Sequence, residues 1–218
     1  MRLLVIAKEP VPGLVKTRLS PPYTPEQAAQ LAAAALGDTL EAVQAVPGTD
    51  AVLVLSGRRP QFVDTALPVV AQRGDGLAAR LSAAFEDAAG DGPVLLVGMD
   101  TPQLTPTLLT SACAVLASAA SGAASPVAVL GPAADGGWWA LGLTRGQPRL
   151  LEGVPMSVAS TAAATRQRLV ERGYRVLELP VLRDVDTATD VVEVAAAAPD
   201  TRFAALVRQL EPVPMVTR

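Results

Sequence analysis

Short, wholly apolar segments recur along this 218-residue chain, and longer stretches with helical patterns separate them. The segments at 3–7, 94–97 and 127–130 contain no polar side chain, which is typical of strands buried on both faces of a parallel sheet. Further strands are predicted at 51–55, 68–72, 138–143 and 175–179. Strands that alternate with helices of this length predict an α/β fold with a mostly parallel central sheet flanked by helices.

Capping patterns mark where several helices begin. Thr24, Pro25 and Gln27 combine an N-cap, a proline at the first helical position and the residue that closes a capping box. The cap and proline recur at 105–106, and a second capping box is predicted at 187–190. The predicted helices span 25–45, 77–89, 105–120, 160–172, 187–198 and 201–210. We expect one domain over residues 1–210 and a C-terminal tail over 211–218.

The amino-acid composition excludes several classes of site. The chain has no histidine and a single cysteine, Cys113. It therefore has no Ser-His-Asp triad, no internal disulfide and no metal site built from cysteine and histidine. A metal must be held by oxygen atoms, which indicates a hard cation such as Mg²⁺ or Mn²⁺.

Charge and hydropathy limit the partners and the location. The formal net charge of −3 argues against nucleic acid, because binding a phosphate backbone needs a basic surface. No apolar run predicts a membrane span, and the N-terminus lacks a signal-peptide pattern, so we expect a cytoplasmic protein. The alanine-rich helices at 28–45 and 112–120 leave open whether they pack inside one molecule or between the subunits of a homodimer.

Positive charge gathers in the loop after the first predicted strand. Ala7 ends that strand, and Lys8, Lys16 and Arg18 follow within eleven residues, with Gly13 between the lysines. These are the two lysines of the chain, which otherwise uses sixteen arginines. Ligands of open α/β sheets bind beyond the carboxyl ends of the strands, where such cations can stabilise a leaving phosphate. A solvated basic loop is the alternative.

Carboxylates follow two further strands. Asp100 comes directly after the apolar strand at 94–97, where it can hold a hard cation against a diphosphate; a turn or capping aspartate is the alternative. Asp184 and Asp186 point the same way if their segment is extended. The charge preference of the following helix N-terminus is a sufficient explanation for one of these two, so this pair is the weaker indication.

The segment between the strands at 127–130 and 138–143 has two interpretations. Asp135, Gly136 and Gly137 allow a bulky ligand to approach the backbone, but Asp-Gly equally indicates a hairpin turn. Trp138 and Trp139 follow, and in a strand their side chains point to opposite faces. We therefore expect one in the core and the other in a pocket.

Four segments in this order and spacing resemble a known family. They are AKEPVPGLVKTRL at 7–19, GMDTPQL at 98–104, PAADGGWWALGL at 132–143 and LRDVDTATD at 182–190. The chain resembles, over residues 1–192, an uncharacterised "domain of unknown function" family that is glycosyltransferase-A-like, of the selenodomain-associated transferase type. The segment KTRLSP is more distantly similar to the N-terminal loop of guanylyltransferases that build molybdenum and deazaflavin cofactors. The resemblance implies the Rossmann-like nucleotide-diphospho-sugar transferase (GT-A) fold.

The resemblance also implies roles for individual residues. Asp100 matches the metal-binding aspartate and Asp186 the second aspartate of the metal site. Lys8, Lys16 and Arg18 match the phosphate-facing loop. The implied set that contacts the nucleotide or its acceptor consists of Ala7, Lys8, Gly13, Lys16, Arg18, Gly74, Asp75, Gly136 and Gly137.

Two positions depart from the family pattern. Trp138 stands where the family usually has tyrosine, on the acceptor side. Asp75, Gly76 and Leu77 only approximate the family's Gly-Asp-Leu-Gly pattern, and the glycines there either leave room for a nucleotide base or turn the chain.

These residues lead to three functional hypotheses. The first is a metal-dependent glycosyltransferase-like enzyme that uses a nucleotide-sugar and a small-molecule acceptor, with Asp135 as general base and Lys16 stabilising the leaving phosphate. The second is a nucleotidyltransferase of the guanylyltransferase type, which uses a nucleoside triphosphate and a small phosphorylated acceptor. The third is a nucleotide-binding protein without turnover.

Overall fold

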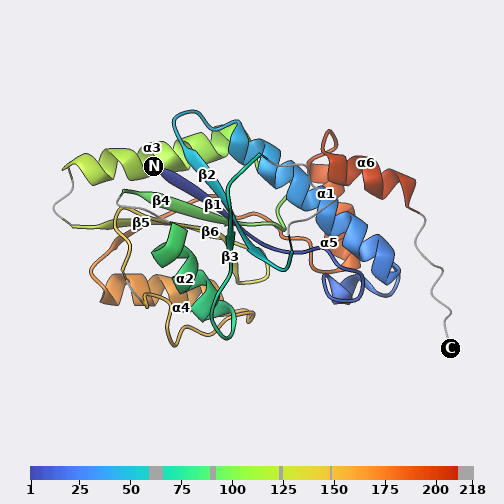
Figure 1. Cartoon of the computed structure of the whole chain (residues 1–218), viewed down its shortest axis with the longest axis horizontal. Helices are drawn as coiled ribbons and strands as arrows, with labels where there is room; N and C mark the ends of the chain where they lie inside the picture. The colour runs from blue at the N-terminus through green and yellow to red at the C-terminus, as the bar shows by residue number, and fades with distance from the viewer. Residues whose placement is uncertain (59–65, 89–91, 123–124, 148, 211–218) are drawn as a thin grey trace.

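The computed structural model describes residues 1–58, 66–88, 92–122, 125–147 and 149–210 (Figure 1). Its strands are β1 (Arg2–Lys8), β2 (Asp50–Ser56), β3 (Val69–Ala71), β4 (Val94–Gly98), β5 (Val127–Pro132), β6 (Trp138–Leu143) and β7 (Arg175–Glu178). Its helices are α1 (Pro25–Gln44), α2 (Leu77–Ala88), α3 (Pro106–Gly122), α4 (Thr161–Glu171), α5 (Ala188–Ala197) and α6 (Arg202–Gln209), and η1 is a 3-10 helix at Thr17–Leu19.

The predicted strands and helices are confirmed, with ends that differ by at most two residues. The capping boxes at the start of α1 and α5 are both formed, and Thr105 Oγ1 accepts a hydrogen bond from Leu108 N at the start of α3. The last residue of the helix predicted at 77–89 and the tail predicted at 211–218 lie outside the described residues. None of the helices in the described ranges is both long and apolar enough to cross a bilayer.

A seven-stranded sheet in the order β3-β2-β1-β4-β6-β5-β7 forms the centre of the fold. β6 is antiparallel to β4 and β5, and the other neighbouring pairs are parallel. The sheet is therefore mostly parallel, as predicted. β5 and β6 pair directly across residues 133–137, so the Asp-Gly sequence there forms a hairpin connection.

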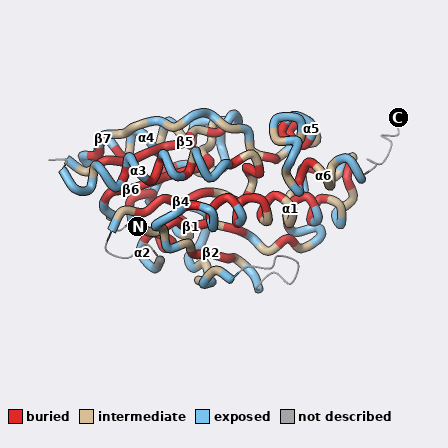
Figure 2. The backbone as a smooth tube through the Cα atoms, turned by 90° about the horizontal axis from the view of Figure 1, so that it is seen from above, coloured by how far each residue is buried: buried red, intermediate tan, exposed pale blue. Residues whose placement is uncertain are grey.

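Helices cover both faces of this sheet (Figure 1). α1 and α3 lie on one face, where they pack against Leu3 and Val5 of β1, and α2 and α4 lie on the other, against Leu4. This alternation explains why residues 3–7 of β1 are all apolar, because successive side chains reach two separate cores. In Figure 2 the buried positions run along the central strands and along α1.

The C-terminal helices α5 and α6 share a buried cluster with α1. Leu31 of α1, Val191 of α5 and Phe203 of α6 belong to one buried cluster. Asp38 of α1 orients α6: its two carboxylate oxygens accept hydrogen bonds from Arg202 N and Phe203 N, each at 2.9 Å. A carboxylate at a helix N-terminus satisfies backbone donors and interacts favourably with the helix dipole.

We expect Asp38→Ala to lower the free energy of unfolding by about 1–3 kcal/mol, because the substitution leaves two backbone donors at the start of α6 without their acceptor. Chemical denaturation measures the loss. Glu41→Ala is the matched control, since Glu41 pairs with Arg202 at 2.7 Å between side chains that are 67% and 60% exposed. Such a surface pair contributes about 0–1 kcal/mol. Equal losses in the two variants would contradict the role given to Asp38.

Candidate functional site

A cavity of about 490 Å³ opens at the carboxyl ends of β1, β2 and β4. The last residues of these strands, Lys8, Ser56 and Gly98, all line it. β1 lies between β2 and β4 in the sheet. After β1 the chain forms β2 and β3 toward one edge, and it then returns to form β4 and the later strands on the other side of β1. Open α/β sheets bind ligands at such a reversal of strand order.

The loop after β1 carries Lys16 into contact with two carboxylates. Lys16 Nζ lies 2.7 Å from Asp100 Oδ2 and 2.8 Å from Asp186 Oδ1, and the lysine side chain is only 8% exposed. Burial acts to lower the pKa of Lys16, but the charges of Asp100 and Asp186 outweigh it and raise this pKa above its usual value. Lys16 is therefore a buried ammonium whose charge is balanced by two acids that are far apart in the sequence.

Backbone hydrogen bonds hold the acidic segments together. Val185 N donates to the carbonyl oxygen of Asp100 at 3.0 Å, which joins the segment after β7 to the end of β4. Ala134 N donates to the carbonyl oxygen of Leu182 at 2.9 Å, which joins the same segment to the hairpin at 133–137. Three separate stretches of chain thus deliver their carboxylates to one region.

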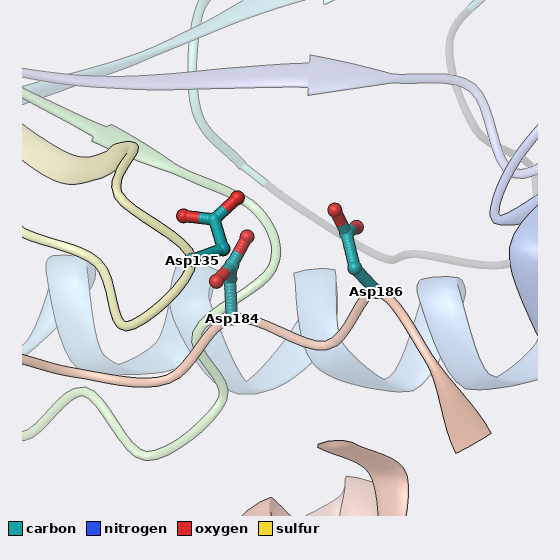
Figure 3. A group of neighbouring side chains, drawn as sticks. All are labelled: Asp135, Asp184 and Asp186. Carbon is teal, nitrogen blue, oxygen red and sulfur yellow. The ribbon is translucent and has the colours of Figure 1, made fainter. Parts of the chain in front are cut away.

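Asp135, Asp184 and Asp186 form an acidic cluster in this region (Figure 3). Each offers one carboxylate oxygen, and these oxygens lie within 4.8 Å of one another. Burial, followed by the charges of Asp135 and Asp186, raises the pKa of Asp184 to about 6. Asp184 and Asp186 project from the same side of their extended segment, as the sequence predicted for an extended conformation.

The other two cations of the β1 loop differ in their contacts. Arg18 Nη1 lies 3.4 Å from Asp186 Oδ2, and the arginine side chain is 68% exposed. Lys8 Nζ donates to the carbonyl oxygen of Leu14 at 2.6 Å, within the loop itself. Lys8 and Arg18 both line the cavity, so all three cations stand where a phosphate can reach them.

The structure brings most of the predicted site residues to the cavity. Those that line it are Ala7, Lys8, Lys16, Arg18, Asp100, Asp135, Gly137 and Asp186. Four others, Gly13, Gly74, Asp75 and Gly136, are not among the lining residues. A ligand contact by these four therefore stays a prediction, and close packing within the protein itself explains the glycine at two of them, Gly74 and Gly136.

The glycines outside the lining allow turns and close backbone packing. Gly74 has a φ of +106°, and a Cβ there would lie 2.9 Å from Ala79 Cβ at the start of α2. Asp75 beside it is exposed. Gly136 has a φ of +89°, and a Cβ there would lie 2.0 Å from the carbonyl oxygen of Ala159. The space beside Gly136 is thus filled by the backbone of Ala159 and not left open for a ligand.

We expect Gly136→Ala to destabilise the protein more than Gly13→Ala does. Both glycines have a positive φ, which costs a side chain about 1–2 kcal/mol, but a Cβ at Gly13 would meet nothing within 4 Å. At Gly136 the clash with Ala159 adds to that cost and displaces the hairpin that carries Asp135. Denaturation curves of the two variants measure the difference, and equal losses would count against the close packing of Gly136.

The paired tryptophans divide as the sequence predicted. Trp139 is 2% exposed in the core, and Trp138 lines the cavity. Trp138 Nε1 donates to the buried Thr165 Oγ1 at 3.2 Å. Gln72 is a further cavity residue that the sequence patterns do not indicate. Its Nε2 donates to the carbonyl oxygens of Ala7 and Val54, at 2.7 and 3.0 Å, and its side chain lines the cavity. No motif marks Gln72, because only the packing of β3 beside β2 places it there.

Comparison with known proteins agrees with this architecture. A family model described as "Uncharacterized protein conserved in bacteria (DUF2064)" matches residues 39–158. No curated protein matches the chain by sequence. A crystal structure from Desulfovibrio desulfuricans G20, provisionally named a nucleotide-diphospho-sugar transferase, matches with a TM-score of 0.82 and 26% identity over 95% of this chain and 94% of that one.

Two enzymes that are more distant in sequence share the fold. CMP:2-keto-3-deoxy-manno-octonic acid synthetase, solved in complex with CTP, matches with a TM-score of 0.58 and 12% identity over 95% of this chain and 98% of that one. 4-Diphosphocytidyl-2C-methyl-D-erythritol synthase from Anaerococcus prevotii DSM 20548 matches with a TM-score of 0.57 and 12% identity over 90% and 95%. At this identity the two matches show the fold alone. The predicted nucleotide-diphospho-sugar transferase fold is confirmed.

Proposed function

Because the chain belongs to the DUF2064 family of uncharacterised bacterial proteins, and its fold is that of nucleotide-diphospho-sugar transferases, we propose that it is a metal-dependent glycosyltransferase-like enzyme. Its donor is a nucleotide-sugar and its acceptor a small molecule with a free hydroxyl. The observation that carries the proposal is that two cations, Lys16 and Arg18, line the same cavity as four carboxylates, those of Asp100, Asp135, Asp184 and Asp186. Within this group Lys16 contacts Asp100 and Asp186, and Arg18 contacts Asp186. The match to the Desulfovibrio protein supports the donor class.

The side chains of this site fit a hard divalent cation such as Mg²⁺ or Mn²⁺. The candidate metal ligands of the site are all carboxylate oxygens, the ligand type that these cations prefer. Asp100 Oδ1 is buried and has no hydrogen-bond partner among the described residues, so it has an unused acceptor. We assign Asp100 and Asp186 to the cation, with Asp184 as an additional carboxylate. When bound, the cation would offset charge on the diphosphate of the donor as the glycosyl bond breaks.

The remaining residues have distinct roles in this proposal. Lys16 and Arg18 bind the diphosphate from the β1 loop and stabilise the charge that develops on the leaving phosphate. Asp135 accepts the proton of the acceptor hydroxyl as general base, and its carboxylate is oriented by a 2.7 Å hydrogen bond from Gly137 N to Asp135 Oδ1. Trp138 lines the acceptor side, where its ring offers a flat apolar surface.

A nucleotidyltransferase is the second candidate, and one observation favours it. Asp135 belongs to a carboxylate cluster, and a carboxylate that holds a cation is not free to act as a base. In nucleotidyl transfer the acceptor phosphate is already nucleophilic, so no general base is required. Lys16 would then contact the α-phosphate of a nucleoside triphosphate, and pyrophosphate would be the leaving group.

Product analysis separates the two reactions. A thermal-shift screen first finds the nucleotides that raise the melting temperature. The protein is then incubated with Mg²⁺ or Mn²⁺, with either nucleotide-sugars or nucleoside triphosphates, and with a panel of small acceptors that carry a free hydroxyl or a phosphate. Glycosyl transfer releases a nucleoside diphosphate, and nucleotidyl transfer releases pyrophosphate. Metal-dependent nucleotide binding with neither product would indicate a binding protein without turnover and would contradict the proposed activity.

A further inference from the structure

The carboxylates that we assign to the divalent cation already hold a cation of the protein's own. Lys16 Nζ lies within 2.8 Å of an oxygen of both Asp100 and Asp186. An ammonium and a metal ion cannot occupy the space between the same two oxygens. The inference below rests on the proposed function, because it concerns the same metal site.

We propose that Lys16 is an internal counter-ion that the divalent cation must displace, so that the site takes up the cation together with a diphosphate group and binds the free cation weakly. The cation then replaces Lys16 at the two carboxylates, and the diphosphate replaces the two carboxylates at Lys16. The ligand of this site is therefore a metal–diphosphate complex.

The burial of Lys16 explains why both partners must arrive. With its side chain 8% exposed, Lys16 has little water to replace the two carboxylates if a cation takes them. An ammonium left buried without an anionic partner is unfavourable. A phosphate in the cavity removes this cost, because Lys16 lines the cavity beside Lys8 and Arg18.

The same contacts explain why Lys16, among the cations of the loop, has this role. Lys8 Nζ is bound to the carbonyl oxygen of Leu14, and Arg18 is largely exposed, so neither stands between two carboxylates. By linkage, a cation that favours the displaced position of Lys16 must raise the affinity for diphosphate, and diphosphate must raise the affinity for the cation by the same factor.

Equilibrium dialysis with Mn²⁺ alone tests the first half of the proposal. We expect Lys16→Met to bind Mn²⁺ about tenfold or more tightly than the wild-type chain, because the competing ammonium is gone. Lys8→Met is the matched control: it removes the same charge from the same loop but frees no carboxylate, so its effect on Mn²⁺ affinity should be much smaller. Lys16→Gln provides a second, polar replacement if Lys16→Met does not fold.

Dialysis with radiolabelled pyrophosphate, with and without Mn²⁺, tests the second half. Mn²⁺ should increase pyrophosphate binding strongly in the wild-type chain and much less in Lys16→Met. Unchanged or weaker Mn²⁺ binding by both Lys16 variants would overturn the inference, as would an equal gain in Lys8→Met.

The outcomes separate this inference from the proposed function. If the wild-type chain retains Mn²⁺ with pyrophosphate but the Lys16 variants show no gain for Mn²⁺ alone, the inference fails and the proposed metal site stands. If no variant retains Mn²⁺ under any of these conditions, both fail.

Discussion

Asp100→Asn is expected to abolish metal-dependent nucleotide binding and to lower the rate of transfer by roughly 10³-fold, a loss of the several kcal/mol that a bound cation supplies to the transition state. The substitution keeps the size of the side chain but removes the negative charge at Oδ2, which lies 2.7 Å from Lys16 Nζ. It also removes a carboxylate that is 34% exposed and whose buried Oδ1 atom has no hydrogen-bond partner among the described residues. Calorimetric titration with nucleotide, with and without Mg²⁺, measures the binding, and product release measures the rate.

Asp200→Asn is the matched control for this experiment. Asp200 is an exposed aspartate that is not among the residues that line the cavity. Its substitution removes the same charge without touching the carboxylates around Lys16. Nucleotide affinity that is unchanged by Asp100→Asn, or a loss of equal size in Asp200→Asn, would contradict the metal role of Asp100.

Lys16→Ala is expected to lower kcat by roughly 10²–10³-fold, the effect of removing one preorganised donor at a developing negative charge. The Michaelis constant for the donor should change much less, because Arg18 and Lys8 still line the cavity and still attract the diphosphate. Steady-state kinetics at saturating metal separates the two parameters. A rise in the Michaelis constant with unchanged kcat would contradict a role for Lys16 in the transition state.

Lys8→Ala is the control for the charge of the loop. Lys8 lines the same cavity, but its Nζ is bound to Leu14 O and not to a carboxylate of the site. We expect this variant to weaken donor binding more than it lowers kcat. Lys16→Ala should therefore combine two opposite effects, a slower reaction and tighter binding of the free cation. A lysine that only attracts the diphosphate by its positive charge would not give this combination when it is removed.

Much of the fold could be predicted because its signals are local. A capping box needs only four consecutive residues, and those that begin at Thr24 and Thr187 both form. The apolar run of β1 predicted a strand buried on two faces, since Leu3 and Leu4 of one strand reach separate cores. Such patterns are read within one element, and they do not depend on which elements become neighbours.

The hairpin at 133–137 shows where local signals were insufficient. The sequence of Asp135 and the two glycines after it is compatible with a turn and with a ligand contact. In the structure these residues form the turn between β5 and β6, and Asp135 and Gly137 also line the cavity. Gly136 contacts the backbone of Ala159, from a segment that follows β6 by more than a dozen residues. The sequence alone could not show that contact, because nothing in either segment specifies the other.

The amino-acid sequence by itself determined the chemistry that this protein has at its disposal: no histidine, one cysteine, two lysines in one loop and aspartates after the strands. Residue types are fixed by the sequence, and so are the short-range preferences that make strands and helices. The tertiary structure alone decided that Lys16 lies between Asp100 and Asp186, and that Asp184 joins Asp135. These contacts depend on the order of strands in the sheet and on backbone hydrogen bonds such as Val185 N to Asp100 O, which form only when distant parts of the chain pack together.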